Sequence, residues 1–216
     1  MTSVGVIAWT LAGAVIGAGA QVLARRWMPR PDHRRLLELA GAVATGSLFA
    51  LLAWRLGAQL PLFAYSWLAM VSVPLATIDW AIRRLPTTLI LTGAGGMITL
   101  LCVTAGLDHD LAALLRALTG TVVILALYGA LYVAIPGQFG GGDLRLGGLL
   151  GCALAWLGWT TLATGTLSGW VAAALALLVQ RAAGGRSASN ASLPLGPFLI
   201  IGAFAAVLTA PASASV

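Results

Sequence analysis

Long apolar runs separated by short polar breaks cover nearly the whole chain of 216 residues. Most runs come close to the length of about 20 residues that a helix needs to cross a hydrocarbon core of about 30 Å, and the short seventh run is expected to extend a little at each end. None alternates polar and apolar residues with a period of two, as membrane strands do. The pattern predicts an all-α, polytopic integral membrane bundle of about eight transmembrane helices. These helices are expected at residues 4–24, 37–54, 61–78, 86–105, 112–135, 144–161, 166–178 and 195–208.

Composition narrows the class of protein further. Hydrophobic residues make up 60% of the chain and charged residues 8%, whereas a soluble domain has about 25% charged residues. The loops are short, and no shift in composition marks a linker. A single transmembrane domain covering residues 1–216 is therefore expected.

The basic residues predict how the chain is oriented. All twelve are Arg, and if the spans alternate, only Arg55 and Arg116 fall on one side of the membrane while the other ten fall on the opposite side. Positively charged residues are retained in the cytoplasm. The N and C termini of a multi-pass plasma-membrane protein are thus expected outside, with Asp79 and Asp143 at the cytoplasmic face. Topology and anionic inner-leaflet lipids also account for the net charge of +6, so no nucleic-acid partner is expected.

Cysteine and histidine argue against a cofactor. Cys102 and Cys152 stand alone in apolar runs, which supports neither a disulfide framework nor a zinc site. His33 and His109 are expected on opposite sides of the membrane, so they cannot converge on a metal ion. Two structural roles are also expected. Trp residues, Trp170 among them, should mostly mark helix ends, and Gly13 with Gly17 should pack the first span against a neighbour.

Two of only six acidic residues occupy helix boundaries. A charged residue at the centre of a membrane helix costs about 2.5–3.5 kcal/mol on insertion scales, so such residues commonly mark function. Asp79 is expected near the C-terminus of the third helix, where the helix dipole disfavours negative charge. The alternative is an interfacial ion pair with Arg83, four residues further on.

Asp143 is expected at the start of the sixth helix, after a glycine run. The glycines at 140–142 allow a second backbone to approach closely and allow a positive φ, as a peptide-binding cleft requires. The alternative is that Asp143 only caps the helix, a common role for this residue type. Two acids on one face, without another candidate nucleophile, favour a pair that activates water.

Three motifs resemble those of the type IV prepilin peptidases, the GxGD-type aspartyl proteases of the bacterial inner membrane. They are IDWAIRRLP at 78–86, GGGDLRL at 140–146 and LPLGPFL at 193–199. Their order and spacing match the family from about residue 60 to residue 208. The resemblance implies that Asp79 and Asp143 are the catalytic pair, with Gly140 and Gly142 as a flexible shoulder that contacts substrate.

The resemblance also implies a reaction and a partner. The substrate would be a prepilin or pseudopilin precursor of type IV pilus or protein-secretion systems, whose short basic leader is removed. Larger members carry a cytoplasmic insertion with paired CxxC motifs, and that form also N-methylates the trimmed pilin. Residues 25–36, the corresponding loop here, hold no Cys. A short form without the methylase-associated insertion is therefore expected.

Opposite helix ends suggest different roles for the two acids. The helix N-terminus favours the anion of Asp143, so Asp143 is expected to act as base, while Asp79 begins protonated. An ion pair between Arg83 and Asp79 would reverse this preference. The competing interpretation of the whole chain is a non-catalytic membrane transporter or a pilus or secretion assembly scaffold.

Overall fold

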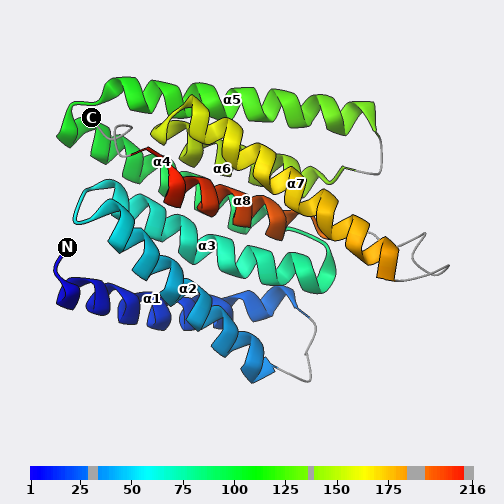
Figure 1. Ribbon diagram of the computed structural model, residues 1–216, viewed down its shortest axis with the longest axis horizontal. Coiled ribbons are helices and arrows are strands. Elements are labelled where there is room, and N and C mark those ends of the chain that lie inside the picture. The colour runs from blue at the N-terminus through cyan, green and yellow to red at the C-terminus, as the bar shows by residue number, and fades with distance from the viewer. Residues whose placement is uncertain (29–33, 136–138, 184–192, 212–216) are drawn as a thin grey trace. The chain divides into compact units, whose positions relative to one another are not determined.

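The computed structural model describes residues 1–28, 34–135, 139–183 and 193–211. Arg30, His33 and Arg186 lie outside these ranges. Within them every regular element is a helix (Figure 1). The helices are α1 (Ser3–Ala24), η1 (Arg25–Trp27), α2 (Arg34–Leu56), α3 (Pro61–Ile82), α4 (Thr87–Asp108), α5 (Leu111–Ala134), α6 (Gly141–Leu157), α7 (Trp159–Ala183) and α8 (Gly196–Thr209).

Helix lengths support a multi-pass membrane protein. In the part of the chain that the structure describes, six helices are long and apolar enough to cross a membrane: α1, α2, α3, α4, α5 and α7. The other two α-helices are shorter, with 17 residues in α6 and 14 in α8. Each predicted apolar run overlaps a helix, and six of the helices in the described ranges reach a full membrane-crossing length.

The predicted boundary between the sixth and seventh spans is wrong. The sixth span was expected to continue to residue 161, but α6 ends at Leu157 and α7 begins at Trp159. Gly158 lies between them with φ 151° and ψ 163°. A side chain is strained at such a φ, whereas glycine adopts it readily. The apolar run continues through this turn, so hydropathy alone does not reveal it.

The first compact unit, Met1–Leu115, contains α1 to α4. Here α1 packs along α2, and both also contact α3. Gly13 and Gly17 allow the close approach of α1 and α2, because a Cβ atom at either would come within 2.5 Å of Phe49 or Thr45. The predicted packing role of this glycine pair is confirmed.

The second unit, Arg116–Val216, contains most of α5 together with α6, α7 and α8. α8 packs mainly against α7 and also contacts α6. Arg116 donates from Nε to the Ala155 carbonyl oxygen at 2.7 Å, and its terminal nitrogen donates to the Trp156 carbonyl oxygen. These carbonyls lie in the last turn of α6, which has no intrahelical donors for them. The guanidinium therefore ties α5 to the end of α6.

Candidate active site

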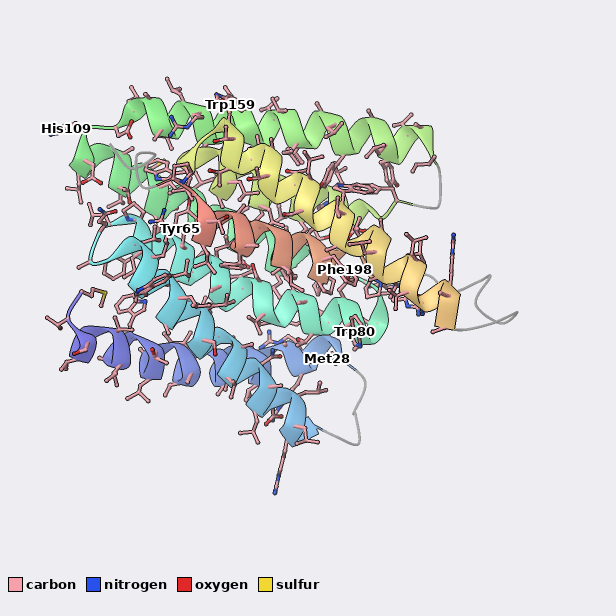
Figure 2. The ribbon with its side chains drawn as sticks, in the orientation of Figure 1. Met28, Tyr65, Trp80, His109, Trp159 and Phe198 are labelled. Carbon is pink, nitrogen blue, oxygen red and sulfur yellow. The ribbon has the colours of Figure 1, made fainter. Side chains whose placement is uncertain are left out.

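Asp79 lies in the last turn of α3, in the first unit, and is 5% exposed. Arg83 ends the helix in a left-handed conformation with φ 52°, and its backbone N–H donates to the Asp79 carbonyl oxygen at 2.8 Å. Trp80 lies beside Asp79 at the end of the helix and is 61% exposed (Figure 2). A buried carboxyl at a helix C-terminus lies where the dipole disfavours its anion, as the sequence predicted. The Asp79–Arg83 ion pair stays a prediction.

A side-chain hydrogen bond joins α1 to α3 two residues before Asp79. Gln21 of α1 is 2% exposed, and its Oε1 accepts a hydrogen bond from Thr77 Oγ1 at 3.1 Å. Thr77 Oγ1 also lies 2.9 Å from the Pro74 carbonyl oxygen. Pro74 has no N–H and interrupts the hydrogen bonding inside α3. Gln21 therefore joins α1 to the weakened part of α3 that precedes the acid.

Sequence reasoning missed Gln21. It is a polar amide within an otherwise apolar membrane-length helix. Amide side chains in such helices frequently hydrogen-bond across to a neighbouring helix. That rule, applied to the first span, could have identified it.

Asp143 lies in the first turn of α6, in the second unit, and is half-buried. The cap of this helix is Gly140, so the alternative that Asp143 is itself the N-cap is wrong. Asp143 is the third helical residue. An acid there is favoured by the dipole and can reach back toward the cap. Its carboxyl does so, because a Cβ atom on Gly140 would lie 2.8 Å from Asp143 Oδ2.

The glycines before Asp143 differ in part from expectation. Gly140 has φ −80° and ψ 137°, while Gly141 and Gly142 already belong to α6. None of the three has a positive φ, so the expected left-handed backbone is not found at 140–142. The missing side chain at Gly140 instead leaves room for the Asp143 carboxyl. The role of Gly140 and Gly142 in substrate contact stays a prediction.

Three aromatic rings flank the start of α6. Phe139, immediately before the glycines, is 5% exposed and stacks on Trp170 of α7 with ring centroids 6.0 Å apart. Tyr128 of α5 contacts both rings edge-on, and its hydroxyl accepts a hydrogen bond from Trp170 Nε1 at 2.9 Å. Tyr128 also lies within electrostatic range of the Asp143 carboxyl. The cluster anchors the segment that presents Asp143.

Sequence analysis did not foresee this cluster. Trp170 was expected to mark a helix end, yet it lies in the middle of α7, and the expectation is wrong for this residue. Gly147 of α6 gives Tyr128 its space, because a Cβ atom there would lie 2.4 Å from the Tyr128 ring. The glycines at 147, 148 and 151 were a possible sequence indication that a large side chain packs across α6.

The third motif opens α8. Pro194, Gly196 and Pro197 are buried, and Pro197 occupies the first turn of the helix, where proline is tolerated because no intrahelical N–H bond is needed. Phe198 lies in the same turn (Figure 2). The motif therefore begins a short, mostly buried helix within the second unit.

The two predicted acids thus belong to different units, and each is held at a helix end of opposite polarity. Among the described residues, no three His, Cys, Asp or Glu side chains are close enough to hold a metal ion.

Comparison with known proteins adds no family assignment. The chain matches no protein-family model, no curated protein and no solved structure.

Proposed function

We propose that this chain is an intramembrane aspartyl endopeptidase. It removes the short basic leader from type IV prepilin-like precursors, either pilins or pseudopilins, at the cytoplasmic face of the plasma membrane. Asp79 and Asp143 activate the water that attacks the scissile amide. The proposal rests on the motif resemblance together with one structural observation: the burial of Asp79 to 5% exposure in the last turn of a membrane-length helix. The helix dipole disfavours a carboxylate at that end of a helix, and charged residues at membrane depth commonly mark function.

The helix ends support different roles for the two acids. The first turn of α6 favours the anion of Asp143, whereas the last turn of α3 favours the neutral acid of Asp79. Asp143 then serves as the base toward water, and Asp79 protonates the carbonyl oxygen. Two carboxyls that bind one water cannot both ionise easily, so the proposed mechanism requires the pair to share one proton.

Substrate recognition follows from the backbone chemistry of the leader junction. An amide within an intact helix is shielded, so the precursor must present an extended segment. Gly140, which has no side chain and an extended ψ of 137°, offers a backbone that such a segment can pair with. The arginine-rich face of the enzyme repels the basic leader, so apolar contact with the precursor helix supplies the attraction.

Co-expression with candidate pilin precursors tests the proposal. Wild-type chain is expected to convert the precursor to the shorter mature form on a denaturing gel, and the new N-terminus can be sequenced. Asp79→Ala and Asp143→Ala are expected to leave the precursor intact while still accumulating in the membrane. A transporter or assembly scaffold would give no trimming with any variant, and that outcome would overturn the proposal.

Replacing Gly140 with Ala is expected to slow cleavage by about 10²-fold, because a shift of about 1 Å in a reacting group can have that effect. The added methyl would lie 2.8 Å from Asp143 Oδ2, so the carboxyl must move. Initial rates of precursor cleavage in detergent give the measurement. Gly129→Ala, on α5 with open space around it, is the control and should keep the wild-type rate. An unchanged rate in Gly140→Ala would contradict the inferred carboxyl position.

A further inference from the structure

An apolar cleft lies in the first unit. It has a volume of about 340 Å³ and is lined by side chains of α1, η1, α3 and α4. That volume is near the lower end of the range of about 300–1,000 Å³ for small-molecule sites. The cleft lining includes Ile16, Gly19, Ala20, Leu23, Arg26 and Trp27.

Small residues of α1 create the space. A Cβ atom on Gly19 would meet no other atom within 4 Å, so the cleft extends to the helix backbone. Ile16 and Leu23 on the same helix are 40% and 58% exposed. The helices that form the walls are long and apolar enough to cross a membrane. The medium around such a wall is lipid, so an acyl chain is the expected occupant.

One end of the cleft carries charge. Arg26 is exposed, and its guanidinium lies 5.5 Å from the centre of the Trp27 ring. Both residues belong to η1, which follows directly on the C-terminus of α1. The neighbouring Arg25 pairs with Glu38 of α2, whereas none of the described residues that line the cleft is acidic. A cation and an indole at a helix end form the usual membrane-interface pairing.

We infer that this cleft binds one anionic phospholipid, with an acyl chain against Gly19 and Ala20 and the phosphate on Arg26. The apolar cleft accounts for the chain, and the positive rim accounts for the preference for a negatively charged headgroup. Trp27 lies where the two regions meet and holds the Arg26 guanidinium over its ring. The inference does not depend on the proposed peptidase activity.

Native mass spectrometry of the delipidated full chain in detergent tests the inference. The probes are dioleoylphosphatidylglycerol, dioleoylphosphatidylcholine and free glycerol 3-phosphate. One phosphatidylglycerol is expected to bind at low concentration, with weaker binding of phosphatidylcholine and none of glycerol 3-phosphate. Equal retention of both lipids, or binding of glycerol 3-phosphate alone, would overturn the inference.

Matched variants locate the site. Gly19→Leu should fill the cleft and exclude methylene groups of the acyl chain from it. Each buried methylene contributes to lipid affinity, so phosphatidylglycerol binding should weaken at least about tenfold. Gly95→Leu on α4, which also faces open space, should bind normally. Arg26→Gln should weaken binding about fivefold through the lost charge, whereas Arg35→Gln, an exposed Arg outside the cleft, should not. Equal effects of the two variants within either pair would refute the site.

Discussion

Replacing either Asp79 or Asp143 with Asn is expected to lower the rate of leader removal by at least about 10³-fold, since acid–base groups contribute about 10²–10⁴-fold. Asn keeps the shape of the side chain but can neither accept the proton from water nor donate one to the carbonyl oxygen as an acid. The double variant should be no slower than the slower single variant, because paired catalytic groups act as a unit. Initial rates with purified chain and a purified precursor measure both effects.

The same variants distinguish the roles of the two acids. If Asp143 is the base, activity must be lost as falling pH protonates it, and residual activity of Asp143→Asn should lack that acidic limb. Residual activity of Asp79→Asn should keep the limb. Asp108→Asn, an exposed residue at the end of α4, is the control and should resemble wild type. Identical pH profiles for the two variants would refute the assignment, and undiminished cleavage by either would refute the pair.

Gly202→Ala is expected to be the most destabilising single-methyl addition in the second unit. A Cβ atom at Gly202 would lie 2.4 Å from the Gly169 backbone nitrogen and 2.8 Å from the Gly165 carbonyl oxygen of α7. Backbone atoms cannot rotate away as a side chain can, so the helices must separate. Overpacking usually costs about 1–3 kcal/mol, and about 3 kcal/mol is expected here. Thermal unfolding in detergent should show a lower Tm.

Gly129→Ala on α5 provides the matched control for this effect. A Cβ atom there meets nothing within 4 Å, and Ala has a higher helix propensity than Gly by about 1 kcal/mol. Its Tm should therefore equal or exceed that of wild type. A Gly202→Ala protein with wild-type Tm would show that α7 and α8 are not in backbone contact.

Hydropathy alone located most of the helices because most apolar runs are bounded by Arg, Pro, Gly or Asp residues, which commonly end membrane helices. It failed at Gly158, where one residue reverses the chain inside an apolar run. Hydropathy also did not predict where α6 begins. Gly141 and Gly142 belong to the helix, although glycine has a low helix propensity. Tertiary packing overrides the low helix propensity of glycine in such positions.

The positions of Asp79 and Asp143 at helix ends followed from local sequence, since each is next to a helix-ending or helix-starting element. The residues that surround the two acids could not be predicted from local sequence. Gln21 hydrogen-bonds to Thr77, on the same helix as Asp79 but 56 residues later in the chain. Trp170 hydrogen-bonds to Tyr128, which lies 42 residues earlier. Such pairings depend on which helix faces pack together, and a single sequence does not specify that choice.

The short length of α8 has a consequence for the surrounding bilayer. Its 14 residues rise about 21 Å, against a hydrocarbon core of about 30 Å. Most of these residues are buried within the second unit, so the difference in length is met by neighbouring helices and not by lipid. We expect the bilayer beside this unit to keep the thickness set by the longer α5 and α7, without thinning around α8.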